Sequence, residues 1–244
     1  IYGDGPETMA DFSSRGPCAD GRIKPDIVAP GTYIASLQSA SATDEYAWAA
    51  ISENYQYQGG TSQAGPHASG AAAVFVQYYR ENYGHTPSPA LVKAALINSA
   101  VDLFDEYGTE PVPNMDEGWG RLDLTGLLDP GLQCEYVDQT TALVQSQVYE
   151  TSVILKDAEA PLKATLAYTD VPGLPIAEAA LVNDLDLEVV APDGAVYRGN
   201  QFLHGESIRG AAQGDRINNV EGVLISAPIP GEYVIRVRAH SILS

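Results

Sequence analysis

The spacing of apolar residues predicts two helices in the first half of the chain. An Ala- and Gly-rich run with apolar residues at helical spacing predicts a helix over about residues 63–83, closed by Gly84. Apolar positions repeat at the same period over 91–96, directly after Ser88 and Pro89. Serine is a favoured N-cap and proline fits the first helical turn, so we expect the second helix to begin there.

From about Gln133 the helical period gives way to alternation of apolar and polar residues, which is typical of strands. The alternating segments are Val148–Val153, Leu162–Leu166, Leu185–Val189, Val220–Ile225 and Tyr233–Val237. A turn at Pro192-Asp193-Gly194 separates two of them. Several short strands separated by turns predict an all-β sandwich or jelly roll. We therefore place a domain boundary near Leu132, with domains at 1–132 and 133–244.

Composition narrows the class of protein. The 244 residues are 45% hydrophobic, which is enough for a packed core, and carry a net charge of −19. This acidity argues against a nucleic-acid partner and against an anionic membrane surface. No apolar run approaches the roughly 20 residues that cross a bilayer. We expect a secreted protein, and because the chain begins at Ile1 we expect a processed or excised part of a longer one.

Cys18 and Cys134 are the only cysteines. They either form one long-range disulfide or stay free, because the sequence does not show whether they approach each other. A zinc site is not expected, since no His or Cys lies at ligand spacing to either of them.

Ser62 stands at the start of the first predicted helix, after Gly59 and Gly60. One interpretation is purely structural, with Ser62 as the N-cap of this helix. The alternative is a nucleophile, because the free N–H groups and the dipole at a helix N-terminus favour negative charge. An oxyanion that forms on a substrate beside Ser62 would be stabilised there.

Four segments favour the nucleophile. Gly60-Thr61-Ser62, followed by Ala64, Pro66 and His67, closely resembles the nucleophile motif of the subtilisin-like serine proteases (subtilases), although Gln63 stands where that family usually has Met. The other segments similar to that family are Phe12–Gly16, Lys24–Gly31, which includes a predicted short buried strand over 26–29, and Gly118–Arg121. The resemblance implies a catalytic-domain portion with a mostly parallel sheet and helices, in which Ser62 forms an acyl-enzyme.

The second half resembles the β-sandwich that follows the catalytic domain in one group of bacterial alkaline subtilases. The residues that carry this resemblance are Leu181–Leu187, Ala191–Gly194, Gly199-Asn200 and Asn218–Glu221. That group often binds calcium. Asp184 and Asp186 alternate onto one strand face and Asp170 ends the preceding strand, so these three carboxylates are the candidate calcium ligands. The alternative is a solvated acidic face.

The rest of a catalytic triad has no counterpart in the sequence. Subtilisin, which is among the standard examples of a triad, carries Asp, then His, then Ser along its chain. The four histidines, at 67, 85, 204 and 240, all follow Ser62, and His67 matches the motif histidine, which is not the base. We expect His67 to be packed and hydrogen-bonded. The triad Asp and His and the oxyanion-hole Asn are therefore expected to be absent from this chain.

Two functions follow from this absence. The chain is either the C-terminal part of a secreted endopeptidase acting on protein or peptide substrates, or a noncatalytic binding module. In the first case, the N-terminal half of the catalytic domain or another chain supplies the base and covers an otherwise exposed sheet edge. Tyr46, Trp48, Tyr55 and Tyr57 precede Ser62 and either line a substrate cleft or pack a loop onto the body.

Overall fold

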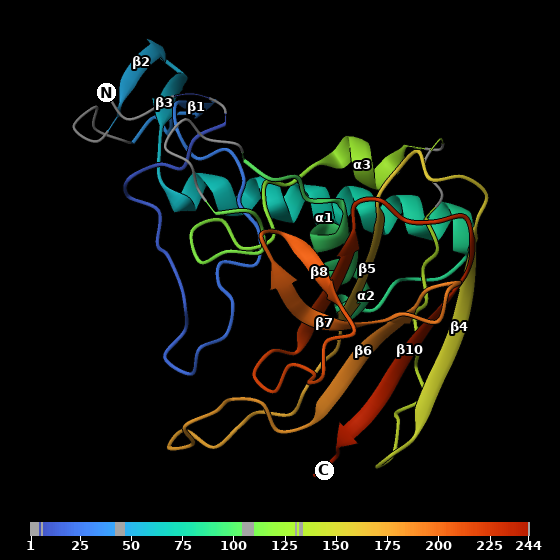
Figure 1. Ribbon diagram of the computed structural model, residues 1–244. Coiled ribbons are helices and arrows are strands. Elements are labelled where there is room, and N and C mark those ends of the chain that lie inside the picture. Colours follow the sequence, from blue (N-terminus) through green and yellow to red (C-terminus); the bar gives the residue numbers. More distant parts are fainter. Residues whose placement is uncertain are drawn as a thin grey trace.

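The computed structural model describes residues 5, 7–41, 47–103, 110–129, 131 and 134–243. The first half holds three strands and three helices, and the second half holds strands (Figure 1). In chain order the elements are β1 (Ile34–Leu37), β2 (Ala49–Ser52), β3 (Tyr55–Gln58), α1 (Thr61–Tyr83), α2 (Pro89–Ser99), α3 (Leu124–Leu128), β4 (Val148–Leu155), β5 (Leu162–Ala167), β6 (Asp184–Val190), β7 (Val196–Leu203), β8 (Glu206–Arg209), β9 (Val220–Ile225) and β10 (Gly231–Ser241).

Helix α1 forms where the sequence predicts it, starting two residues earlier. Ala71, Phe75 and Tyr79 recur every four residues and are buried, so one stripe of the helix faces the core. They pack with Leu96 of α2 and Leu127 of α3. Gly84 ends the helix in the left-handed conformation, with its N–H donating to the Arg80 carbonyl.

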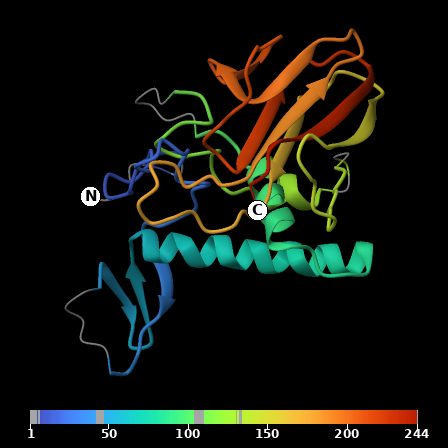
Figure 2. The same ribbon diagram turned by 90° about the horizontal axis from the view of Figure 1, so that it is seen from below.

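The outer side of α1 is open in the part of the chain that the structure describes. Figure 2 shows the body of the molecule on one side of this helix only. Val74 is 41% exposed, and a Cβ built on Gly65 or Gly70 meets nothing within 4 Å.

Strands β1, β3 and β2 form an antiparallel sheet that projects from the N-terminal end of α1 as an arm (Figure 1). This sheet was not predicted from the sequence. The ring of Trp48 holds its base, with edge contacts to Phe12 at 6.1 Å and to Tyr33 at 5.2 Å.

The parallel sheet expected for residues 1–132 is reduced to an isolated bridge. Among the described residues, parallel pairing is limited to Val28 and Arg121, where Val28 N–H donates to Gly120 at 3.0 Å. The strand predicted over 26–29 is therefore a single bridged residue. Pro25 and Pro30 flank it, and because proline lacks an N–H, neither can extend the ladder.

The second half consists of two antiparallel sheets packed face to face. One has the strand order β4-β10-β6-β7-β8 and the other pairs β5 with β9. They share a buried core that includes Leu187, Val189, Val223, Ile225 and Tyr233. All five predicted strands are present, and Gly194 N–H donates to Ala191 in the predicted turn. Strands β7 and β8 were missed because β7 lacks clean alternation and is irregular between Tyr197 and Phe202.

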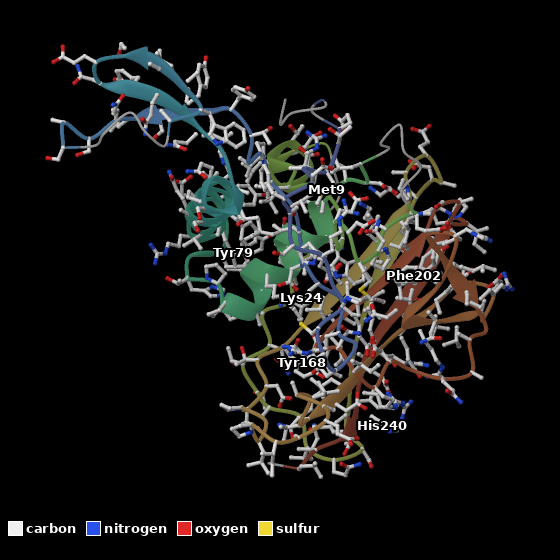
Figure 3. The ribbon with its side chains drawn as sticks, turned by 90° about the vertical axis from the view of Figure 1, so that its left-hand side faces the viewer. Met9, Lys24, Tyr79, Tyr168, Phe202 and His240 are labelled. Atoms are coloured by element: carbon white, nitrogen blue, oxygen red, sulfur yellow. The ribbon has the colours of Figure 1, made fainter. Side chains whose placement is uncertain are left out.

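The two halves pack against each other. Trp119 lies edge-on to Phe202 at 6.0 Å, and a Cβ on Gly222 would lie 2.4 Å from its ring (Figure 3). Gly118, with φ 65°, lies so close to the backbone that a Cβ would be 1.9 Å from the Pro25 carbonyl oxygen. Gly118 and Gly222 thus allow close backbone packing around Trp119.

The predicted boundary at Leu132 and Gln133 falls on residues outside the described part of the chain. Beyond it, Tyr136 still packs on Phe75 of the first core at 5.4 Å, and the strands of the second half begin at Val148.

Cys18 and Cys134 are free, which decides the open question of the disulfide. Cys134 is exposed at the surface. No described helix combines the length and the apolar character needed to span a membrane.

Candidate active site

Ser62 is the second residue of α1 and is exposed. The N-cap is Gly60, whose conformation (φ 141°) favours glycine, and no side chain caps this helix end. The N-cap interpretation of Ser62 is therefore wrong, and its hydroxyl stands at the open end of the helix. Gly60 is fixed from behind, because its N–H donates to the Gly31 carbonyl at 2.7 Å.

The end of α1 is suited to negative charge. The first helical N–H groups have no partner within a helix, and no acidic residue lies in the first turn of α1. An oxyanion next to the Ser62 hydroxyl would meet the positive end of the helix dipole and the Ser62 N–H.

The aromatic residues before Ser62 pack the arm onto this turn. A Cβ on Gly59 would lie 2.0 Å from the Trp48 ring, so only glycine allows the ring to lie there. Tyr57 joins the same cluster through Tyr33 at 6.1 Å, whereas Tyr55 is 49% exposed. Tyr46 lies outside the described residues. The geometry of Trp48 and Tyr57 favours loop packing over a cleft wall.

None of the four histidines, all of which are described, is bonded to Ser62. His67 points its Nδ1 at the Gln63 carbonyl, 2.8 Å away, and is exposed rather than packed. His85 Nε2 lies 3.4 Å from the Tyr79 hydroxyl. His204 forms the turn between β7 and β8, and His240 lies beside Asp186. The base for Ser62 is thus not found among these rings.

Asp26, in the second subtilase-like segment, has a structural role. It pairs with Lys24 and, at 3.0 Å, with Lys93. Burial disfavours its charge, but the two ammonium groups outweigh burial and hold the pKa of Asp26 below its ordinary value.

Comparison with known proteins agrees with this geometry. Residues 4–120 match the family model described as the subtilase family. Residues 4–120 belong to the subtilase family. The chain is 33% identical to the "Serine protease/ABC transporter B family protein tagA" of Dictyostelium discoideum over 95% of this chain and 14% of that protein. The chain is also 41% identical to the "Minor extracellular protease Vpr" of Bacillus subtilis, over 51% of this chain and 15% of that protein.

The chain spans under a fifth of the length of these curated subtilase relatives. Among solved structures, the patellamide maturation protease PatA is similar at 24% identity and a TM-score of 0.32, over 48% of this chain and 35% of PatA.

A cluster of carboxylates lies in the second half, outside the subtilase region. Oxygens of Asp184, Asp186 and Glu221 lie within 4.8 Å of one another, and all three residues are buried. The pKa of Glu221 is raised to about 9. Burial is the largest cause, and the charges of the neighbouring carboxylates contribute to the same rise. Burial likewise raises the pKa of Asp184.

Asp170 does not join this cluster, so its assignment as a ligand is corrected. Its carboxylate accepts from the backbone N–H of Val182 at 2.7 Å and of Asn183 at 3.1 Å. Because the Asp170 oxygens accept from these backbone N–H groups, the residue holds the loop before β6 in place.

The donor set of the cluster fits a divalent cation in part. Asp184 Oδ1 and Glu221 Oε1 are buried without a hydrogen-bond partner among the described atoms, as expected where a ligand is to be received. Against this, the Arg216 guanidinium contacts Asp186 and lies 3.3 Å from Asp184, so it already supplies one positive charge.

Glu221 and Arg216 were missed in the sequence. Glu221 is the last residue of the Asn218–Glu221 segment that carried the family resemblance, and that position was the one signal available.

Proposed function

We propose that this chain is part of a subtilisin-like serine endopeptidase in which Ser62 is the nucleophile. The observation that carries the proposal is the Ser62 hydroxyl, exposed at the open N-terminus of α1 and not used as a cap, within a subtilase region. Ser62 Oγ would attack the scissile carbonyl carbon as its proton passes to a base. The amine then leaves with a proton, and water hydrolyses the ester. The Ser62 N–H would donate to the oxyanion.

The base, its orienting Asp and the oxyanion-hole Asn would come from the N-terminal half of the catalytic domain or from another chain. The open side of α1 leaves room for this partner, since Val74 is exposed and a Cβ on Gly70, on the same side of the helix, meets nothing within 4 Å. The partner would cover this face. Protein or peptide chains would be the substrates.

A fluorophosphonate probe tests the proposal, because it labels only an activated serine. We expect no labelling of the chain alone and labelling at Ser62 once a polypeptide with the family's Asp and His segments is added. Ser62→Ala should abolish it. Ser69→Ala is the matched control, since Ser69 lies on the same helix and bonds only the Gly65 carbonyl at 3.1 Å among the described residues.

Labelling of the chain alone at Ser62 would show that the base lies within it. Failure to label with the partner bound would favour the second candidate, a noncatalytic secreted binding module. That candidate is supported by the absence of a histidine bonded to Ser62 among the described residues and by the separate pocket in the second half.

We further propose that Asp184, Asp186 and Glu221 hold calcium. The cation would supply positive charge to the two unpartnered oxygens and replace the proton that burial otherwise retains on Glu221. Calcium should raise the unfolding temperature of the chain, and Asp184→Asn with Asp186→Asn should remove that rise. Asp170→Asn should leave it in place, although it weakens the loop. An equal response in all variants contradicts the site.

Secretion is part of the same proposal. The strongly acidic composition supports it, as does the similarity to a relative whose name describes an extracellular protease.

A further inference from the structure

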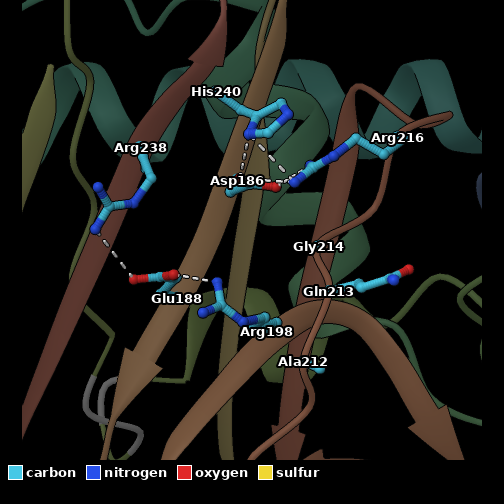
Figure 4. Close-up of a pocket in the computed structure, with 9 residues that line it drawn as sticks. All are labelled: Asp186, Glu188, Arg198, Ala212, Gln213, Gly214, Arg216, Arg238 and His240. Carbon is cyan, nitrogen blue, oxygen red and sulfur yellow. Dashed lines mark hydrogen bonds and ion pairs between the residues drawn. The ribbon is translucent and has the colours of Figure 1, made fainter. Parts of the chain in front are cut away.

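A charged pocket of about 370 Å³ lies on the face of the five-stranded sheet that points away from the core (Figure 4). Its floor comes from three neighbouring strands, with Asp186 and Glu188 on β6, Arg198 on β7 and Arg238 on β10. The loop over 212–216 forms one wall. No residue of the pocket comes from the subtilase region.

The carboxylates hold the guanidinium groups in place. Arg198 bonds Glu188 with one nitrogen and the Ala211 carbonyl with another, at 3.0 Å. Arg216, on the loop, donates to both carboxylate oxygens of Asp186 through its two terminal nitrogens. Figure 4 shows Arg198 and Arg238 on opposite sides of Glu188, and Arg216 beside Asp186. Guanidinium groups fixed in this way lose little conformational entropy when a ligand binds.

Hydrogen-bond donors outnumber acceptors in the pocket. Each of the three guanidinium groups has five N–H donors and no acceptor, whereas only two carboxylates line the pocket. Arg238 Nη2 lies 3.8 Å from Glu188 Oε2, which is an ion pair but too long for a hydrogen bond. The side chain of Arg238 is 44% exposed, so its donors face the opening. A ligand that accepts hydrogen bonds fits this excess.

The lining also limits the kind of ligand. None of the nine described residues that line the pocket is Phe, Tyr or Trp, and the one ring is the imidazole of His240, which lies 3.3 Å from Arg216 Nη2 and 3.7 Å from Asp186 Oδ2. Three guanidinium groups face two lining carboxylates, and Asp184 adds a third carboxylate under Arg216. These charges balance, so the pocket has no net positive charge to hold a polyanion, and an anion bound here would be held by the excess of hydrogen-bond donors.

The loop that forms the pocket wall lies very close to Asp186. A Cβ on Gly214 would lie 2.1 Å from Asp186 Oδ1 and 2.9 Å from Arg216 Nη1. Only glycine lets the loop backbone lie against the carboxylate and bring Arg216 over it.

We propose that this pocket binds a single oxyanion group, which is either a tetrahedral phosphate or sulfate or a planar carboxylate. Guanidinium groups bind both kinds through paired, charge-assisted hydrogen bonds. The pocket then gives the second half a ligand-binding role that does not depend on Ser62.

Calorimetric titration of the 244-residue chain with sulfate, phosphate and acetate, at constant ionic strength in chloride, tests the proposal. We expect saturable binding at one site. Arg238→Gln should weaken it at least tenfold. Arg236→Gln is the matched control, because it removes the same charge from the same strand but pairs with Glu150 outside the pocket. It should change the affinity by less than twofold.

The remaining outcomes are also decisive. Tighter sulfate or phosphate binding identifies a tetrahedral group, tighter acetate binding identifies a carboxylate, and equal binding identifies an oxyanion site that does not discriminate. No saturable binding of any probe, or equal weakening by Arg236→Gln and Arg238→Gln, overturns the proposal. If Arg238→Gln unfolds the chain, Gln213→Glu replaces it, since this exposed lining residue adds a repelling charge without altering an arginine. Ser62→Ala should leave the binding unchanged, so this proposal and the protease proposal fail separately.

Discussion

At the scale of single residues, Glu221 stands out as a carboxyl group that is fully buried and whose pKa is strongly raised. It is fully buried, and its Oε2 accepts from the Leu187 N–H at 2.7 Å between β9 and β6. The irregular course of β7 near Gly199 leaves room for this side chain, because a Cβ on Gly199 would lie 2.1 Å from Glu221 Oε2. The carboxyl group fills a place that β7 would otherwise occupy in the sheet.

Glu221 makes stability depend on pH in the absence of calcium. Its pKa rises from 4.5 to about 9 on folding, so between these values the folded state holds a proton that the unfolded state has lost. Stability therefore falls as pH rises through this window, by up to about 1.4 kcal/mol per pH unit for one proton. Glu221→Gln, which stays neutral, should flatten the decline.

Urea unfolding at pH 5 and pH 8 in the presence of a chelator measures the effect of Glu221→Gln. Asp170→Asn is a control, because the Asp170 carboxylate lies outside the cluster and accepts from backbone N–H groups. A wild-type stability that is equal at both pH values contradicts the assignment.

What the sequence predicts about side chains depends on how local the cause is. The place of Ser62 at the start of a helix could be predicted from residues 59–70, since the glycines and the helix that position it adjoin it. Asp184 and Asp186 followed from strand alternation. Glu221 could not be assigned, because it reaches the cluster from another sheet. Asp170 was assigned wrongly because carboxylate spacing does not show which oxygens backbone N–H groups already hold.

At the scale of elements, helix α2 shows a predicted cap in full. Ser88 Oγ accepts from the Leu91 N–H at 3.1 Å, and Pro89 follows at the first helical position. The Ser88 N–H donates to Asp138 at 2.8 Å, which links the segment after α3 to this helix end. The N-cap thus helps to fix a later part of the chain.

Ser88→Ala should lower the free energy of unfolding by about 1 kcal/mol, the usual effect of losing a serine cap. Ser69→Ala on α1 removes the same hydroxyl from an exposed mid-helix position, where alanine has the higher helix propensity, so it should be neutral or slightly stabilising. Denaturant unfolding compares the two variants. Equal losses would mean that the Ser88 hydroxyl does not act as a cap.

Elements with an internal cause were predicted better than elements fixed by their surroundings. Helices α1 and α2 and the five alternating strands carry their own periodicity, whereas the five-residue helix α3 carries none and was not predicted. The arm of β1, β2 and β3 depends instead on Trp48 packing over Gly59. The spacing of apolar and polar residues does not indicate this contact. The strand expected at 26–29 was predicted from a short apolar run bounded by prolines, and those prolines leave it a single bridge at Val28.

At the scale of the whole molecule, the two halves share an interface of polar bonds around Trp119. Asn98 donates to Thr165 at 3.0 Å, and Lys163 donates to the Ala100 carbonyl at 2.9 Å. Ile23 N–H donates to Asn218 at 2.9 Å on the same side as Trp119. These contacts join α2 and the loop around residue 23 to the second half, so the halves should unfold together.

Trp119→Ala tests this coupling. The ring is half-buried between Gly222 and Phe202, so we expect a loss of about 2–3 kcal/mol, below that of a fully buried tryptophan. Hydrogen exchange should show the same loss at the amides of α2 and of β9, because one global opening exposes both. Trp48→Ala is the matched control, since that ring serves the arm and its loss should accelerate exchange mainly in β1, β2 and β3. Protection lost in β9 but retained in α2 would mean that the halves open independently.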